Sequence, residues 1–355
     1  MKPLRNLSLL LLAIIAFSCS GNKAAESGEA YVKLVHDEEN QRVDVTIGGQ
    51  PFTSYLYTDT LPALTKPVLF PVLSAGGSRI TRGFPLDPQP KERTDHPHHI
   101  GVWLNFGDLN GIDFWGNSPA IPAEHAHTLG VTHHEEMGKI ESGNESGSLE
   151  VSMKWYNAQN QAMLKEETRF EFAGGDAWRR IDRVTTLTAI DEPMTFNDTK
   201  EGMMAIRVQR ALEHPSDRPV TLSDAHGLQT EVAKLDNTGV TGHYLNSEGD
   251  EGLDAWGKRA GWVALDGTIG NEKVALIIFD HPDNVGHPTY WHARGYGLFA
   301  ANPFGQATFS DGAEDPLNFS LNPGESVTFK YRILIHSGEI QAEEINEEYR
   351  EYSSR

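Results

Sequence analysis

The chain has 355 residues, of which 50 are Asp or Glu and 30 are Lys or Arg, so its formal net charge is −20 at pH 7. A surface this acidic repels phosphate backbones, and no block of Lys or Arg interrupts it, which excludes nucleic acid as an expected partner. Cys19 is the only cysteine, and a chain with one cysteine forms no internal disulfide.

The first 30 residues predict export and a lipid anchor. Residues 1–18 carry Lys2 and Arg5 ahead of an apolar run that is typical of a signal peptide and too short to cross a bilayer. Small residues directly before Cys19 resemble a bacterial lipobox, so Cys19 would carry the lipid. The polar composition of residues 19–30 is typical of a flexible tether. We expect a protein anchored to the bacterial outer membrane, facing the periplasm or the cell surface, that contacts the membrane only through its lipid.

Strand patterns fill most of the remaining chain. Apolar and polar residues alternate, as in residues 43–47 and 327–333, and Gly, Asn and Asp turns separate the longer runs. Only residues 339–352 place apolar side chains on one helical face. Because no linker divides this body, we predict one all-β domain over residues 31–355, a large antiparallel β-sandwich with a C-terminal helix.

The densest group of chemical side chains lies between Arg93 and Trp103. Asp95 stands beside three histidines, and crowded carboxylate and imidazole groups shift one another's pKa values toward general acid–base use. We predict that His98 or His99 is a base oriented by Asp95. The alternative is a structural role, with the imidazoles bonded to backbone carbonyls at a sheet edge.

The same segment contains an H-x-H pair, His96 and His98, whose side chains would share one face of a regular strand, as metal ligands do. No third ligand stands at a matching spacing, and Pro97 disturbs strand geometry. We expect no bound metal and no cofactor, and a metal-dependent enzyme is the least favoured hypothesis.

Two later segments supply further polar and aromatic groups. Residues 197–202 precede a strand and would provide Glu201 as an acid, with a solvated loop as the alternative. Residues 280–305 alternate His, Arg and aromatic rings between Pro and Gly, a mixture that suits sugar binding, with a packed aromatic corner as the alternative. His292 is a second candidate for the acid, and Arg294 with Lys200 would hold a carboxylate or an enolate oxygen.

The predicted site residues fall into two groups. Those with expected catalytic roles are Asp95, His96, His98, His99, Lys200, Glu201 and His292. Those expected to contact substrate are Arg93, Trp103, Trp115, Arg207, Trp256, Arg259, Tyr290, Trp291, Arg294 and Asn302.

Several blocks in this order resemble the PmoA-like family of exported bacterial proteins. The blocks are Asp95-His-Pro-His-His-Ile-Gly-Val-Trp103, Asn110-Gly-Ile-Asp-Phe-Trp115, Asp198-Thr-Lys-Glu-Gly202, Trp256-Gly-Lys-Arg259 and residues 291–305. The resemblance, over about residues 31–338, implies a β-sandwich, with the mutarotase-like supersandwich as one form of it. It also implies association with sugar oxidoreductases and glycan-degrading enzymes, and it assigns no catalytic residue. The family name comes from a methane monooxygenase membrane subunit, which this chain cannot be, because it lacks the membrane spans.

We therefore expect a carbohydrate-active enzyme that acts on a sugar or an oxidised sugar in polysaccharide utilisation. It would abstract and return a proton, as in epimerisation, elimination or hydration. A non-catalytic sugar-binding surface lipoprotein is the main alternative, and it would need the aromatic and Arg side chains but no titratable pairs. The sequence leaves the substrate and the oligomeric state open.

The lipid anchor gives a first prediction. Cys19→Ala should abolish lipidation, because the Cys19 thiol is the only attachment point that the sequence offers. In a detergent partitioning assay, the parent protein should enter the detergent phase and the variant should stay in the aqueous phase. Equal partitioning of the two proteins would disprove the anchor.

Overall fold

The computed structural model describes residues 31–355 apart from 218–219, 224–228 and 233. The predicted signal peptide (1–18), the tether (19–30) and Cys19 lie outside the described residues. Within the described ranges, no helix is long and apolar enough to cross a membrane.

Two eight-stranded antiparallel sheets make up the body of the protein. The first sheet has the order β1-β2-β3-β4-β5-β11-β18-β17. Its strands are β1 (Val32–Asp37), β2 (Arg42–Ile47), β3 (Gln50–Leu56), β4 (Val68–Val72), β5 (Val102–Phe106), β11 (Gly202–Arg207), β17 (Tyr290–Ala293) and β18 (Leu298–Asn302).

The second sheet has the order β14-β15-β16-β20-β9-β8-β7-β6. Its strands are β6 (Val131–Glu141), β7 (Ser146–Tyr156), β8 (Ala162–Gly174), β9 (Trp178–Ala189), β14 (His243–Asn246), β15 (Trp262–Ile269), β16 (Glu272–Asp280) and β20 (Ser326–Ser337). Smaller elements are the strand pairs β10 (Met194–Phe196) with β19 (Phe319–Leu321) and β12 (Val220–Ser223) with β13 (Gln229–Val232), the 3₁₀ helices η1 (Ala123–Thr128), η2 (Arg210–Leu212) and η3 (Gly252–Ala255), and the helices α1 (Gln306–Phe309) and α2 (Ala342–Ser353).

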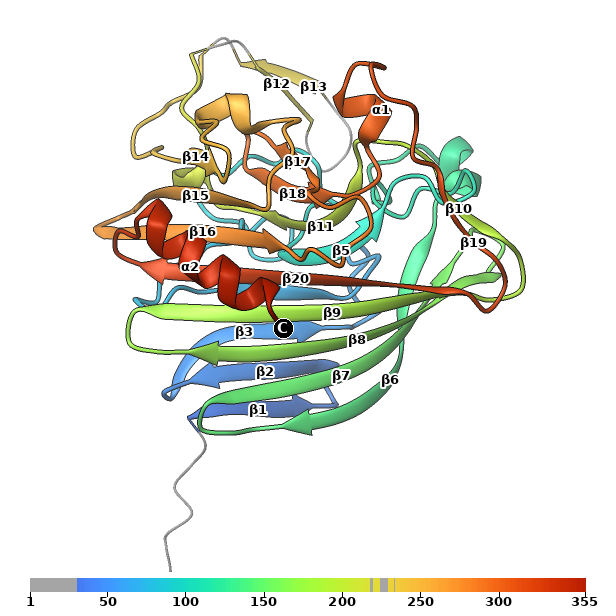
Figure 1. Cartoon of the computed structure of the whole chain (residues 1–355), viewed down its shortest axis with the longest axis horizontal. Coiled ribbons are helices and arrows are strands. Elements are labelled where there is room, and N and C mark those ends of the chain that lie inside the picture. Colours follow the sequence, from blue (N-terminus) through green and yellow to red (C-terminus); the bar gives the residue numbers. More distant parts are fainter. Residues whose placement is uncertain (1–30, 218–219, 224–228, 233) are drawn as a thin grey trace, which may run out of the picture.

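The two sheets pack face to face, and Figure 1 shows β1–β3 lying behind β7–β9. The alternation seen in the sequence explains the packing, because every second residue of a strand points to the same side. Val43, Val45 and Ile47 of β2 and Val327, Phe329 and Tyr331 of β20 all lie in the core between the sheets. The predicted large antiparallel β-sandwich is confirmed.

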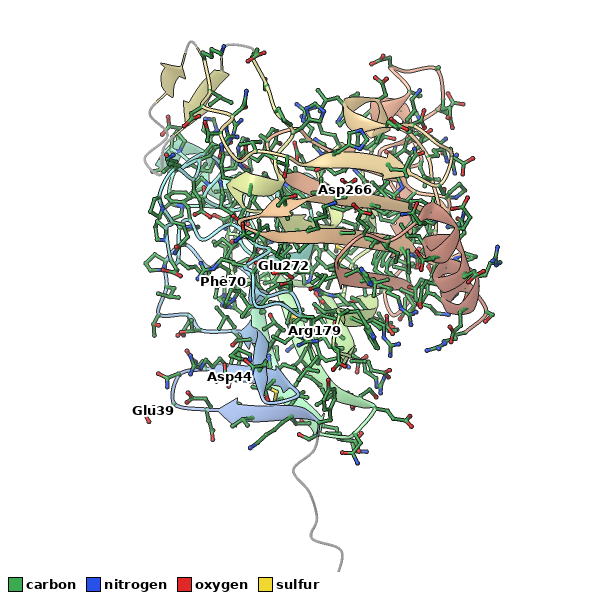
Figure 2. All side chains as sticks on the ribbon, turned by 90° about the vertical axis from the view of Figure 1, so that its left-hand side faces the viewer. Glu39, Asp44, Phe70, Arg179, Asp266 and Glu272 are labelled. Atoms are coloured by element: carbon green, nitrogen blue, oxygen red, sulfur yellow. The ribbon has the colours of Figure 1, made fainter. Side chains whose placement is uncertain are left out.

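Helix α2 covers the outer face of the second sheet, where Ile345 and Tyr352 pack against Phe279 and Leu334. In Figure 2, α2 lies on one side of the molecule and Phe70 on the other. The helix was predicted from residue 339, but it begins at Ala342 because Gln341 and Glu344 form a capping box that fixes its start. The outer face of the first sheet, on the Phe70 side, carries a second apolar cluster.

Candidate functional site

Four neighbouring strands at one end of the first sheet, β5, β11, β18 and β17, present a row of side chains on its outer face. Cross-strand pairing aligns Trp103 with Ala205, Ala205 with Ala300, and Ala300 with His292. Because neighbouring strands lie about 4.8 Å apart, the backbones of Trp103 and His292 are roughly 14 Å apart. Between the Trp103 and His292 rings, the row contains only the methyl groups of Ala205 and Ala300, and both of these residues are buried. Arg207, two residues after Ala205, points to the same side.

Asp95 is held over this face by two buried arginines. Its side chain is 6% exposed, and Oδ1 accepts hydrogen bonds from Arg82 Nη1 at 3.0 Å and Arg207 Nη2 at 2.8 Å. Burial alone would raise the pKa of Asp95, but the charges of Arg207 and Arg82 and the hydrogen bond from His96 outweigh it and hold that pKa well below its usual range. The carboxylate is therefore ionised under all working conditions.

Arg82 also fixes the path of the His-rich segment. Its guanidinium donates to four backbone carbonyl oxygens of that segment, at distances of 2.6 to 3.3 Å: those of Arg93, Asp95, His96 and His99. An arginine has five N–H donors in a rigid plane, so one side chain can set the shape of an entire loop.

The other oxygen of Asp95 orients His96. Asp95 Oδ2 lies 2.9 Å from His96 Nδ1. Since an ionised carboxylate only accepts hydrogen bonds, Nδ1 carries the proton and Nε2 presents its lone pair. The His96 side chain is 41% exposed, so this lone pair is accessible. The residue has a left-handed φ of 45°, a conformation uncommon outside glycine and frequent at functional sites.

The prediction that His98 or His99 is the base oriented by Asp95 is wrong, because the Asp95 carboxylate binds His96 instead. Arg207 Nη1 lies 3.2 Å from His99 Nδ1, and because arginine only donates, Nδ1 of His99 is the acceptor. Burial, together with neighbouring positive groups, lowers the pKa of both histidines well below its usual value. Both rings are therefore neutral, and Asp95 contacts neither of them through its carboxylate.

The rings of this region form a continuous stack. The ring centroids are 5.4 Å apart for Trp103 and His99, 4.9 Å for His99 and His96, and 5.2 Å for His96 and Tyr296. The rings of the last two pairs are nearly parallel. Arg207 covers the ring of Tyr296 at 4.8 Å. Such stacking restricts each ring to one orientation, so His96 is positioned by its neighbours as well as by Asp95.

The segments around residues 200 and 292 reach the same face. His292 Nδ1 donates to the carbonyl oxygen of Lys200 at 2.9 Å, so its Nε2 carries a lone pair. This residue is 1% exposed, and no described residue donates to Nε2. Burial, followed by the charge of Arg294, lowers the pKa of His292 to about 3, and the charge of His96 also contributes. Lys200 and Glu201 form an ion pair at 3.3 Å beside it.

A hollow of about 400 Å³ opens beside the end of the stack. Its lining includes Trp256, Arg294 and Tyr296, and this volume lies in the range typical of small-molecule sites. The Arg294 guanidinium lies between two rings, 5.5 Å from the centroid of Trp256 and 5.6 Å from that of Tyr296. Arg93 also lines the hollow and is paired with buried Glu213 at 2.7 Å.

Trp291 was predicted to bind substrate, and the structure contradicts this. Its ring is fully buried in the core between the sheets, and its Nε1 donates to the carbonyl oxygen of Ala260 at 2.9 Å. The reason is the alternation of β17, which turns Tyr290 and His292 outward and Trp291 inward. Trp103, the first ring of the stack, and Trp115, which packs against it, do belong to the outer face, but both are buried.

Three other predicted substrate contacts have structural partners. The Asn302 amide donates to Thr199 and accepts from the Phe304 backbone, so both of its polar groups are engaged. Arg259 donates to backbone carbonyls of the 286–288 loop and covers the ring of Tyr290. The Tyr290 hydroxyl donates to Glu314 at 2.6 Å. These groups shape the edge of the face, and we do not retain them as ligand contacts.

Sequence reasoning missed Arg82, Tyr296 and Lys66. Lys66 is 4% exposed, donates to the carbonyl oxygen of His98 at 3.2 Å and lies 5.7 Å from the centroid of the Trp103 ring. Burial lowers its pKa to about 8. Lys66 and Arg82 lie outside the His-rich and aromatic blocks, so no sequence pattern marked them. Tyr296 lies inside the aromatic block, where the prediction chose its neighbours Tyr290, Trp291 and Arg294.

The His96 and His98 rings are 5.7 Å apart and nearly perpendicular. Among the described residues, no group of three or more His, Cys, Asp or Glu side chains is arranged to hold a metal ion. The H-x-H pair therefore gains no third ligand from the fold.

Residues 42–350 match the model of a family of unknown function, DUF6807. The chain belongs to this family. The resemblance to the PmoA-like family, which rested on short blocks, is thereby corrected, because the match to DUF6807 spans most of the chain. No curated protein shows significant sequence similarity to it.

Comparison with solved structures finds distant similarities. A GH36 α-galactosidase from Geobacillus stearothermophilus is 14% identical with a TM-score of 0.41, and the match covers 86% of this chain and 41% of the galactosidase. A galactose 1-epimerase from Lactobacillus acidophilus is 12% identical with a TM-score of 0.40, covering 88% of this chain and 100% of the epimerase. A galactose mutarotase related enzyme from the same species is 10% identical with a TM-score of 0.30, covering 87% and 97%. At such identities, an activity for this DUF6807 member has to be argued from its own side chains.

The buried neutral His292 predicts a pH dependence of stability. Its folded pKa of about 3 lies below the unfolded value near 6.5, so the unfolded chain binds more protons between these pH values. The stabilising contribution is complete above pH 6.5 and decreases as the pH falls. Lowering the pH from 7 to 5 should cost about 2 kcal/mol of unfolding free energy through this residue.

Urea unfolding at pH 7 and pH 5 measures this difference. His292→Gln should reduce the pH dependence by that amount, whatever its effect at pH 7, whereas exposed His125→Gln should leave it unchanged. An unaltered pH dependence in His292→Gln would show that His292 is not buried in its neutral form.

Proposed function

We propose that this DUF6807 member is a carbohydrate-active enzyme that moves a proton on a sugar or an oxidised sugar, with His96 as the base. The observation that carries the proposal is the Asp95–His96 pair. A buried, ionised carboxylate holds Nδ1–H of a histidine that stacks between His99 and Tyr296 and whose side chain is 41% exposed. A base oriented by a second group is the usual arrangement for general base catalysis.

The hollow beside Tyr296 supports a sugar as the substrate. Trp256 and Tyr296 line the hollow with aromatic carbons that suit the C–H groups of a pyranose, and Arg294, which lies between the two rings, offers N–H donors. His96 does not line the hollow, but its ring stacks on Tyr296, which does, with 5.2 Å between the two centroids. In the proposed complex, the sugar therefore extends past the Tyr296 ring to bring one of its carbons near Nε2 of His96. Proximity of this kind supplies much of the rate enhancement in enzymes.

The remaining groups have distinct roles in the proposal. Lys200 would stabilise negative charge that develops on a substrate oxygen, and Glu201, ionised in its pair with Lys200, would hold the ammonium group in place. His292, with a pKa of about 3, is neutral, donates its Nδ1–H to the Lys200 backbone and has a buried Nε2, so it would supply no proton and would position the Lys200 segment. Export and the lipid on Cys19 are proposals that rest on residues 1–30.

Deuterium exchange tests this proposal without knowledge of the product. The protein would be incubated in D₂O with separate neutral hexoses, 6-deoxyhexoses and hexuronates, and proton NMR would follow loss of C–H signals and appearance of vinyl signals. We expect exchange or elimination with at least one sugar. His96→Gln should slow it about 100-fold or more, as expected for loss of a general base.

His125→Gln is the matched control, because His125 is also an exposed histidine and lies on η1, away from the stack. It should retain the parent rate. Sugar binding without exchange by the parent protein would favour the non-catalytic sugar-binding lipoprotein. Exchange that persists in His96→Gln would show that another group is the base.

A further inference from the structure

The hollow beside Tyr296 differs in the charge of its lining from four other hollows of this acidic protein. Four hollows of comparable size are each lined by at least one Asp or Glu, as expected for a chain with 50 acidic residues. Among the residues that the structure describes, the lining of the hollow beside Tyr296 contains no acidic residue and two arginines, Arg93 and Arg294. An acid-free lining in a protein of net charge −20 favours an anionic ligand.

Arg294 differs from the other arginines around the site. Arg82 and Arg207 are paired with Asp95, and Arg93 is paired with Glu213. Within the part of the chain that the structure describes, no carboxylate lies within 4.0 Å of the Arg294 guanidinium, which contacts only the faces of Trp256 and Tyr296. Contact with ring faces leaves the N–H edge of a guanidinium open, and that edge matches a carboxylate with two parallel hydrogen bonds.

We infer that the hollow takes a sugar that carries a carboxylate, with Arg294 as the group that binds it. This inference rests on the proposed function, and it narrows the substrate class to the hexuronates and related sugar acids. A planar carboxylate suits the planar guanidinium better than a tetrahedral sulfate ester does, so we assign carboxylate in preference to sulfate.

The position of Arg294 also fits the chemistry assigned to His96. Arg294 and His96 both contact Tyr296, at 5.6 and 5.2 Å from its ring centroid. Both groups are thus neighbours of one tyrosine ring, and we place the carboxylate on Arg294 with the adjacent C–H group toward His96. In the pyranose form of a uronate, the hydrogen on that carbon is the most acidic of the C–H hydrogens, because the electron pair that it leaves is delocalised into the carboxyl group.

The step balances without any further reactant. His96 Nε2 takes the proton from the carbon next to the carboxylate, and the electron pair forms an enolate whose oxygens Arg294 stabilises. Return of a proton to the opposite face gives an epimer. Expulsion of the oxygen substituent on the next carbon gives an unsaturated sugar and an alcohol, which takes up one proton.

Binding measurements test the inference separately from catalysis. Isothermal titration calorimetry would compare galacturonate with galactose, glucuronate with glucose, and galactose 6-sulfate with both galactose compounds. We expect each uronate to bind at least 10-fold more tightly than its neutral sugar. Arg294→Gln should remove this preference, and Arg294→Lys should lose most of it, because an ammonium cannot form the two parallel bonds. Arg350→Gln on α2, whose arginine is exposed, is the matched control and should retain the preference.

Each outcome has one meaning. Equal binding of neutral and carboxylated sugars, binding of neither, or an unchanged preference in Arg294→Gln overturns the inference. Tighter binding of galactose 6-sulfate than of galacturonate overturns the assignment to carboxylate. Uronate binding that depends on Arg294, with no deuterium exchange, supports the inference and contradicts the proposed catalytic function instead.

Discussion

The candidate site depends on one buried carboxylate held between two buried arginines. Asp95 balances part of the charge of Arg82 and Arg207, and removing it would leave two guanidinium groups buried without a carboxylate. Asp95, Arg82 and Arg207 together keep a net positive charge. Arg82 stabilises its share of this charge by donating hydrogen bonds to carbonyl oxygens of the His-rich segment. Because the second oxygen of Asp95 accepts from His96, the same carboxylate that binds the two arginines also keeps the proton of the proposed base on Nδ1.

The sandwich makes this arrangement accessible on one side only. The inner faces of both sheets are apolar, and α2 covers the part of the second sheet's outer face formed by β15, β16 and β20, whereas the outer face of the first sheet carries the Asp95 cluster. Strand order then brings distant segments together, because β5, β11, β18 and β17 are neighbours although their residues run from 102 to 302. Loops at the ends of these strands supply His96 and Tyr296, and a rigid sheet fixes their separation.

Much of the fold and part of the site could be predicted from the sequence. Alternating apolar residues predicted the strands, and residue types alone predicted that the His-rich segment and residues 290–294 supply polar groups. The choice of His96 over His98 and His99 could not be predicted, because it depends on which imidazole meets the Asp95 carboxylate after the loop folds. Reading residues 290–293 as a strand would have separated His292 from Trp291, since neighbouring residues of a strand face opposite sides.

The tautomer of His96 tests the central claim most directly. Long-range proton–nitrogen NMR spectra of uniformly ¹⁵N-labelled protein at pH 8, with His96 identified by comparison with His96→Gln, report which ring nitrogen carries the proton. The Asp95 contact predicts the Nδ1–H form, with an unprotonated Nε2. A His96 ring in the Nε2–H form would mean that Asp95 does not orient it, and would contradict the assignment of His96 as the base.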